Sequence, residues 1–191
     1  MAASTKIYQL KVTLRDIRPP IWRRLQVKSS TNLFQLHLMI QAAMGWENCH
    51  LHSFEVAGVE YGNPKQSYGL DYKDENKARL SSLLKQEKSK FFYNYDFGDS
   101  WEHIVLLEKI LPQEADKSYP MCIKAKRACP PEDCGGAWGY PEFLEAIQNP
   151  DHPEHKQTTE WIGYSFDSEF CDLQEINQKL LDYESLARDW F

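Results

Sequence analysis

The sequence predicts an α+β protein in which a β-grasp-like mixed sheet surrounds one helix, followed by a loop-rich and helical C-terminal part. Three observations predict this fold. Apolar residues alternate at period two before residue 29, recur at helical spacing from residue 33 to 44, and alternate again in several stretches between residues 52 and 110. The order strand, strand, helix, strand, strand, strand matches a β-grasp arrangement, and this likeness concerns shape alone.

The first hairpin is predicted from alternation on both sides of a proline pair. Every second residue from Tyr8 to Leu14 is apolar, which is the period of a half-buried strand. Pro19 and Pro20 cannot continue a central ladder because proline has no N–H group. The period of two resumes from Ile21 to Val27, so we expect a second strand there.

The main helix is predicted over residues 33–44, where the apolar residues fall three and four positions apart. Thr31 or Asn32 can cap its exposed N–H groups, because both side chains carry an oxygen that accepts a hydrogen bond. Gly45 is expected to end the helix, since glycine adopts the left-handed conformation of a helix C-terminus most readily.

The remainder of the sheet is predicted after this helix. Residues 52–61 are expected to be extended, residues 62–77 to form a loop, and residues 80–84 to form one short helical turn. A second hairpin follows, with an aromatic face between residues 91 and 97 and a long β-type run from Trp101 to Ile110. Between these strands, Gly98-Asp99-Ser100 supplies the turn.

Beyond Pro112 the sequence becomes irregular and rich in proline and cysteine, and then predicts short helices. Pro141 is typical of a first helical residue, and Asn149-Pro150 is expected to close that helix. A last helix is expected after Asp172, whose carboxylate can cap it. We expect residues 1–191 to form a single domain, with the sheet in 1–111 and a helical extension of the same domain in 112–191.

Composition limits the classes of partner. The chain has 22 Lys and Arg against 28 Asp and Glu, for a net charge of −6, which disfavours nucleic acid as a partner. No apolar run has the roughly 18 residues of a membrane span, and Met1–Lys6 lacks the apolar segment of a signal peptide. These features predict a cytoplasmic protein without membrane partners. The five cysteines do not fit a secreted disulfide framework, which leaves thiols or metal ligands.

The densest polar group is the segment from Tyr95 to His103. It contains Asp96, Asp99 and His103, whose carboxylate and imidazole groups are good ligands for a divalent metal and can also share a proton. The alternative is structural, because Asp is an ordinary turn residue and a His beside a Trp on a strand often serves packing alone. Cys49-His50-Leu51-His52 is also rich in ligand residues, and His52 opens a strand that could neighbour this hairpin.

A second polar segment contains Glu132, Asp133 and Cys134. The cysteine spacing around it does not match the close pairs of zinc sites, so buried thiols in a tight loop are the alternative. Gly135 and Gly136 precede a predicted helix, and their free N–H groups make them candidates for binding an anion such as a carboxylate or phosphate. The sequence lacks the motifs of nucleotide-binding loops.

Four stretches together carry a resemblance to a known family. They are Leu51-His52-Ser53-Phe54, YNYDFGDSWEH at 93–103, YPMCIKAKRACPPEDCGGAWGYPEFLEAI at 119–147 and GYSFDSEFCDLQEIN at 163–177. With these motifs the chain resembles the plasmid pRiA4b ORF-3-like family over almost its whole length. The resemblance implies no established activity, since most members are described as being of unknown function. It places the characteristic polar residues of the family at His52, Asp96, Asp99, His103, Glu132, Asp133 and Cys134.

Three functions remain open. The first is a non-enzymatic binding or accessory domain that contacts an unidentified protein partner through its aromatic sheet surface. The second is a metal-assisted hydrolase or nuclease-like enzyme that uses Asp96, Asp99, His103 and Glu132. The weakest is a DNA-associated protein linked to mobile elements. We predict no cofactor, and a divalent metal only as an alternative, with Asp96, His103 and Cys134 as its candidate ligands.

Overall fold

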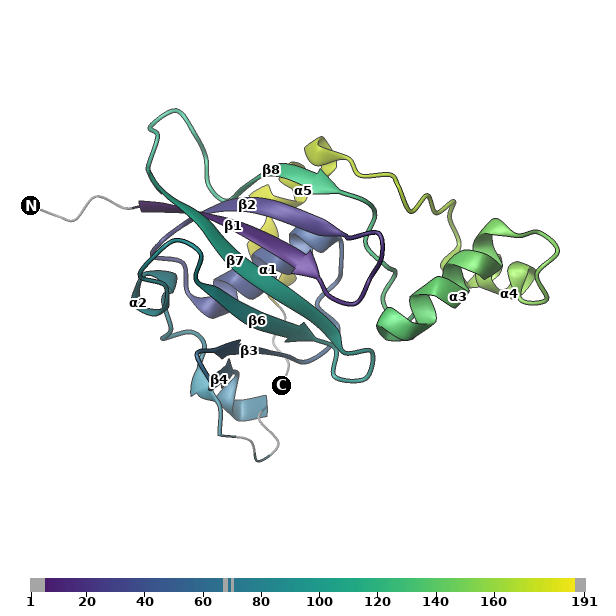
Figure 1. Ribbon diagram of the computed structural model, residues 1–191, viewed down its shortest axis with the longest axis horizontal. Coiled ribbons are helices and arrows are strands. Elements are labelled where there is room, and N and C mark those ends of the chain that lie inside the picture. Colours follow the sequence, from purple (N-terminus) through teal and green to yellow (C-terminus); the bar gives the residue numbers. More distant parts are fainter. Residues whose placement is uncertain (1–5, 67–68, 70, 188–191) are drawn as a thin grey trace, which may run out of the picture.

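Eight strands form one sheet in the described part of the chain, which comprises residues 6–66, 69 and 71–187 of the computed structural model. The strands are β1 (Lys6–Leu14), β2 (Trp22–Lys28), β3 (His52–Val56), β4 (Val59–Gly62), β5 (Lys73–Asp74), β6 (Lys90–Tyr95), β7 (Trp101–Pro112) and β8 (Met121–Lys126). Their order is β5-β4-β3-β6-β7-β1-β2-β8, antiparallel except for the parallel β4–β5 pair (Figure 1). The α+β class with a mixed sheet is confirmed, and the β-grasp likeness stays an expectation.

The helices form two groups. They are α1 (Leu33–Met44), α2 (Leu80–Leu83), α3 (Gly136–Gln148), α4 (His155–Ile162) and α5 (Leu173–Leu181), with short 3₁₀ turns at Pro64–Gln66 and Tyr183–Leu186. Helix α1 lies across one face of the sheet and α5 packs beside it, whereas α3 and α4 stand together at one side of the sheet (Figure 1). No helix among the described residues is both long and apolar enough to cross a bilayer.

Helix α1 begins and ends where the sequence predicts. Asn32 Oδ1 accepts a hydrogen bond from the Gln35 backbone N–H at 2.8 Å, and Gln35 Oε1 accepts one from the Asn32 N–H at 3.1 Å. This reciprocal pair satisfies two N–H groups that the helix leaves open. Gly45 ends the helix in the left-handed conformation, with φ of 89°. Of the two predicted caps, Asn32 is the one used.

The core lies between the sheet and α1. Alternate residues of the central strands point into it and are fully buried, as Leu10, Leu25, Tyr93 and Val105 are. Each such side chain contributes about 1.5–3 kcal/mol when it leaves water. The two predicted hairpins are therefore confirmed, and they give a fixed base to the turn between β6 and β7.

Residues 52–61 form two strands, where the sequence predicted one extended segment. Strands β3 and β4 are joined at Ala57 and Gly58, which have φ of 52° and 77°. Two consecutive residues with positive φ make a tight hairpin turn whose twist matches that of the strands. The predicted loop over 62–77 contains a 3₁₀ turn and the short strand β5, and residues 67, 68 and 70 within it lie outside the described residues.

The region after Pro112 differs most from the prediction. Strand β8 pairs with β2 at the edge of the sheet, where the sequence predicted irregular structure. A register shift between Arg24 and Leu25 interrupts the pairing, so the apolar residues of β8 do not alternate clearly. Helix α3 begins at Gly136, five residues before Pro141, which therefore lies inside the helix. The last helix, capped by the Asp172 carboxylate, is confirmed.

Candidate functional site

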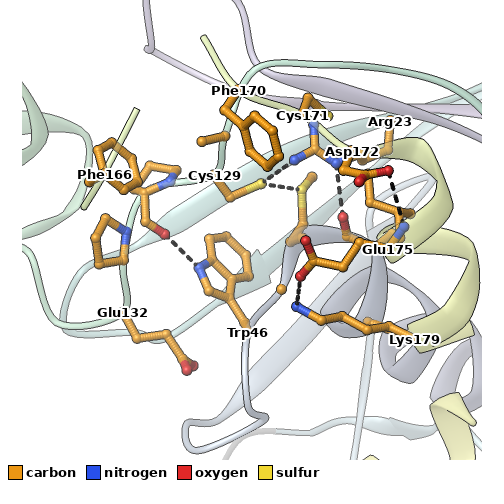
Figure 2. Close-up of a pocket in the computed structure, with 18 of the residues that line it drawn as sticks. Arg23, Trp46, Cys129, Glu132, Phe166, Phe170, Cys171, Asp172, Glu175 and Lys179 are labelled. Carbon is orange, nitrogen blue, oxygen red and sulfur yellow. Dashed lines mark hydrogen bonds and ion pairs between the residues drawn. The ribbon is translucent and has the colours of Figure 1, made fainter. Parts of the chain in front are cut away.

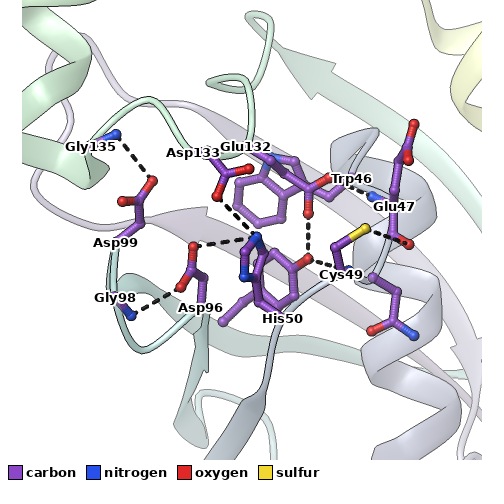
Figure 3. A network of polar contacts seen from close by, with 12 residues as sticks. Trp46, Glu47, Cys49, His50, Asp96, Gly98, Asp99, Glu132, Asp133 and Gly135 are labelled. Atoms are coloured by element: carbon purple, nitrogen blue, oxygen red, sulfur yellow. Dashed lines mark hydrogen bonds and ion pairs between the residues drawn. The ribbon is translucent and has the colours of Figure 1, made fainter. Parts of the chain in front are cut away.

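Three segments that are distant in the sequence meet at the end of β6 and β7. They are the loop after α1, the β6–β7 turn and the loop that precedes α3 (Figure 3). In the turn, Asp96 has φ of 56°, and its Oδ1 accepts a hydrogen bond from the Gly98 N–H at 2.9 Å. This local bond is typical of Asp in turns and leaves Oδ2 directed toward His50.

His50, Asp96 and Asp133 form a group that could hold a metal ion. His50 Nε2 lies 3.2 Å from Asp133 Oδ1 and 3.7 Å from Asp96 Oδ2, and the three ligand atoms all lie within 4.8 Å of one another. A divalent cation binds such atoms at about 2.0–2.6 Å, so one ion between them can reach all three. The Asp133 side chain is 68% exposed, which leaves the group open to solvent on one side. Among the described residues this is the one group of this kind.

Tyr95 and Glu132 fix the two loops that carry His50 and Asp133. The Tyr95 hydroxyl donates a short hydrogen bond to one carboxylate oxygen of Glu132, and the Glu47 N–H donates to the other at 2.9 Å. The Cys49 N–H donates to the Tyr95 oxygen at 2.9 Å. Burial and the bond to Glu132 raise the pKa of Tyr95 above its usual range, so the phenol stays protonated and continues to donate.

Asp99 fills the predicted anion site at Gly135 and Gly136. The Gly135 N–H donates to Asp99 Oδ2 at 3.1 Å, so the anion at this loop is a carboxylate of the chain itself. A Cβ atom on Gly136 would lie 2.2 Å from the Asp99 carbonyl oxygen, and Gly136 has φ of 68°. Only glycine fits such a close backbone approach at positive φ. The pair therefore joins the β6–β7 turn to the start of α3.

His103 lies in the core, outside the group that could hold a metal. Its side chain alternates with Glu102 and Ile104 along β7 and is fully buried between the Trp46 and Tyr93 rings. Neither ring nitrogen makes a hydrogen bond of normal geometry. Burial lowers the pKa of His103 to about 4, so the ring is neutral near pH 7. This placement gives His103 a packing role, while His50 supplies the imidazole of the group.

Cys134 is also outside that group. Burial first, and then the charges of Asp99 and Asp133, raise the pKa of its thiol to about 12. The group of ligand atoms within 4.8 Å of one another does not include the Cys134 sulfur. Of the three predicted metal ligands, the structure thus places Asp96 alone in the candidate group.

His52 belongs to a separate buried network. Its Nε2 lies 2.8 Å from Glu75 Oε2, and its ring stacks on that of His37 with a centroid distance of 3.4 Å and an angle of 3°. His37 in turn bonds the Tyr93 hydroxyl at 2.7 Å and Asn48 Oδ1 at 2.8 Å. Burial lowers the pKa of His52 to about 3 and raises that of Glu75 to about 7, so both neutral forms are favoured.

Five of the seven residues that the sequence singles out lie in the segments that meet at this end of the sheet, whereas His50 is not among the seven. Asp96, Asp99, Glu132, Asp133 and Cys134 lie in the two segments that meet there. His50 stands in the ligand-rich run before β3, and only the pairing of β3 with β6 brings that run to Asp96. The Asp96 N–H bonds the Leu51 carbonyl at 2.8 Å, which shows how close the two segments are.

Comparisons with known proteins agree with the motifs. A family model described as plasmid pRiA4b ORF-3-like protein matches residues 6–175. The uncharacterized protein y4hQ of Sinorhizobium fredii is 40% identical over 186 residues, which cover 96% of this chain and 94% of that protein. The crystal structure of the protein of unknown function MM3350 from Methanosarcina mazei Go1 has a TM-score of 0.81 at 41% identity, covering 91% of this chain and 98% of that one. The chain belongs to the plasmid pRiA4b ORF-3-like family.

Proposed function

We propose that this protein binds one divalent metal ion through His50, Asp96 and Asp133. The observation that carries the proposal is the convergence of three ligand atoms, from three separate segments, within 4.8 Å of one another. One imidazole and two carboxylates suit a borderline cation such as Zn²⁺ or Mn²⁺. The hydrogen bonds of Tyr95 and Asp99 support the proposal, because they hold in place the loops that carry the ligands.

The chemistry that such an ion would supply is activation of water. Three protein ligands leave at least one coordination position for a water molecule, as in catalytic zinc sites. A bound divalent ion lowers the pKa of that water toward neutrality and so generates a nucleophile. A metal-assisted hydrolase is therefore the enzymatic form of the proposal. Asp99 and Glu132 would act around the ion and not as its ligands, since their carboxylate oxygens do not belong to the group of atoms within 4.8 Å of one another.

The test is direct metal binding by the full chain. Isothermal titration of chelator-treated protein with Zn²⁺ and with Mn²⁺ should give one site per chain for at least one ion. His50→Gln, Asp96→Asn and Asp133→Asn each remove a ligand charge or a lone pair while keeping side-chain size. We expect each to weaken binding roughly 10-fold or more.

Asp116→Asn is the matched control, because it removes one carboxylate from the loop between β7 and β8 and leaves the group intact. It should bind as tightly as the unchanged protein. Equal affinity in all four variants, or no binding of either ion, would refute the metal site.

A second candidate is a contact domain for a protein partner, favoured by the exposed aromatic residues of the α3–α4 region. Trp138 on α3 is 93% exposed, and Trp161 on α4 is half exposed. Exposed tryptophan is unusual on a surface without a partner and is enriched at interfaces. Cross-linking with mass spectrometry should identify a partner that is lost in Trp138→Ser but kept in Glu142→Gln, a control on the same helix.

We further propose that residues 1–191 form one cytoplasmic domain with a β-grasp-like sheet. The match of a single family model to residues 6–175 supports the single domain, because it includes both the sheet and the helical extension. The free thiols of the buried Cys122 and the half-buried Cys134 support a reducing compartment. Fractionation of cells that express a tagged full chain would test the location.

A further inference from the structure

A cavity of about 490 Å³ lies between the end of α1, the loop at residues 128–132 and the segment at residues 164–172 that leads into α5 (Figure 2). Its volume is in the range of small-molecule sites. It does not contain His50, Asp96 or Asp133, although Glu132 lines it. The cavity is therefore distinct from the metal group, and an inference about its ligand does not rest on that group.

Four of the side chains that line the cavity are aromatic, and one of them, Trp46, is only 4% exposed. Trp46 lies on one side, and its indole N–H donates to the Pro130 carbonyl at 2.9 Å, which fixes the ring (Figure 2). Phe166 is held by edge-to-face contact with Phe143 of α3 at a centroid distance of 5.2 Å. Tyr164 and Phe170 are 59% and 58% exposed. The wall thus combines fixed rings with two rings that remain open to a ligand.

The charged side chains of the lining are mostly acidic. The acidic ones are Glu47, Glu132, Asp167, Asp172 and Glu175, and the basic ones are Arg23 and Lys179. Lys179 Nζ lies 2.9 Å from Glu175, so these two charges compensate each other within α5. The hydrogen bonds that Asp167 and Asp172 accept come from backbone N–H groups, which leave the negative charge of the carboxylates in place.

Arg23 faces the protein and not a ligand. It is 3% exposed, and its guanidinium group donates to the carbonyls of Ala43, Trp22 and Lys126 at 2.8–3.1 Å and to Cys129 Sγ at 3.0 Å. Ala43 stands in the last turn of α1, where the helix dipole favours a cation. Arg23 therefore stabilises the junction of α1 with β8. Its positive charge stays beside the cavity, but five acidic side chains against two basic ones still leave the lining negative.

We propose that this cavity binds a small organic cation with a quaternary ammonium group. Aromatic faces attract a cation within about 6 Å through their quadrupoles, and this attraction increases when the cation leaves water. The acidic side chains add long-range attraction without direct ligation. A metal ion does not fit this cavity equally well. Among the described residues, no three acidic or thiol groups of its lining have ligand atoms that all lie within 4.8 Å of one another.

The test compares choline with 3,3-dimethylbutan-1-ol, a neutral molecule of the same shape, by isothermal titration into the full chain. The proposal expects saturable binding of choline that is roughly 10-fold tighter than that of the neutral compound, since only the charged compound can make cation–π contacts. Equal affinity for the two compounds would mean that the cavity is merely apolar and would overturn the proposal. Binding of neither compound, or tighter binding of inorganic phosphate, would also overturn it.

Variants at the open rings localise the binding. Tyr164→Ala and Phe170→Ala change exposed side chains, so the fold should be kept, and each should weaken choline binding at least about 3-fold. Leu181→Ala is the control, because it removes an exposed apolar side chain from a different cavity. His50→Gln should bind choline normally, which separates this proposal from the metal site. Unchanged affinity in both aromatic variants would contradict the assignment.

Discussion

At the scale of single residues, burial decides which titratable groups remain available for chemistry. His103 and His50 are both imidazoles near the same end of the sheet, but the first is enclosed by Trp46 and Tyr93 whereas the second faces two carboxylates. Desolvation disfavours the charged form of the buried His103 imidazole, and neither of its ring nitrogens makes a hydrogen bond of normal geometry. The same residue type therefore serves packing in one place and is a candidate ligand in the other.

His103 makes stability depend on pH. Its pKa is lowered from 6.5 to about 4, so between these values the unfolded chain binds more protons than the folded one. The stability from the neutral ring is present above pH 6.5 and is lost as the pH falls through 4, by about 3 kcal/mol in total. We expect His103→Leu to reduce this loss of stability in acid, to which the buried His37 and His52 also contribute because burial lowers their pKa values as well. Urea unfolding at pH 7, 6, 5 and 4 measures the effect.

The control for this change is His152→Gln, which removes a histidine from the loop before α4. It should keep the pH dependence of the unchanged protein. If the free energy of unfolding of His103→Leu falls as much between pH 7 and pH 4 as that of the unchanged chain, the lowered pKa of His103 does not contribute to the loss of stability in acid.

At the scale of elements, the sequence pattern predicted the strands and helices correctly where their residues follow a regular period. The β6–β7 hairpin and α1 could be predicted because alternation, turn residues and a cap all indicate the same structure. The sequence pattern did not predict strand β8, because a register shift in its pairing with β2 disturbs the alternation of apolar and polar residues along β8. The start of α3 was misplaced at Pro141 because Gly136 begins the helix beside Asp99, a contact with another element.

Gly136 gives a test of that contact between elements. Gly136→Ala should destabilise the protein by roughly 2–3 kcal/mol, because a Cβ atom would meet the Asp99 carbonyl at 2.2 Å and φ is 68°. Gly163→Ala is the matched control, since Gly163 has φ of 72° and no atom within 4 Å of a Cβ. It should lose only about 1 kcal/mol, the cost of positive φ alone. Thermal or urea unfolding measures both variants. An equal loss of stability in the two would show that a Cβ atom at position 136 fits beside Asp99 without a clash.

At the scale of the whole molecule, the candidate metal group depends on three segments that are 46 and 37 residues apart in the sequence, measured from His50 to Asp96 and from Asp96 to Asp133. The pairing of β3 with β6 brings the segment of His50 to Asp96, and the bonds of Tyr95 and Asp99 bring the segment of Asp133 to both. A ligand that joins such segments binds the folded chain alone, so its binding energy adds to global stability.

Metal binding should therefore raise the melting temperature of the whole chain. An ion present at 100 times its dissociation constant adds about 2.7 kcal/mol to the free energy of unfolding. We expect calorimetry to show a higher Tm with the ion that binds, a return to the starting value with EDTA, and a shift no more than about half as large in Asp133→Asn, since a 10-fold weaker site still adds about 1.4 kcal/mol at the same ion concentration. The same rise in Asp133→Asn would place the ion elsewhere on the protein.

The sequence by itself determined the α+β class, the two hairpins, the capped helix at 33–44 and the membership of the family, because these follow from local periodicity, turn chemistry and motifs. It also indicated that the β6–β7 turn and the Glu132-Asp133 segment hold the polar residues. Only the tertiary structure decided that His50 and not His103 faces Asp96, and that Asp99 fills the glycine loop. The physical reason is that side-chain direction and long-range pairing fix these contacts, and neither is encoded by spacing along the chain.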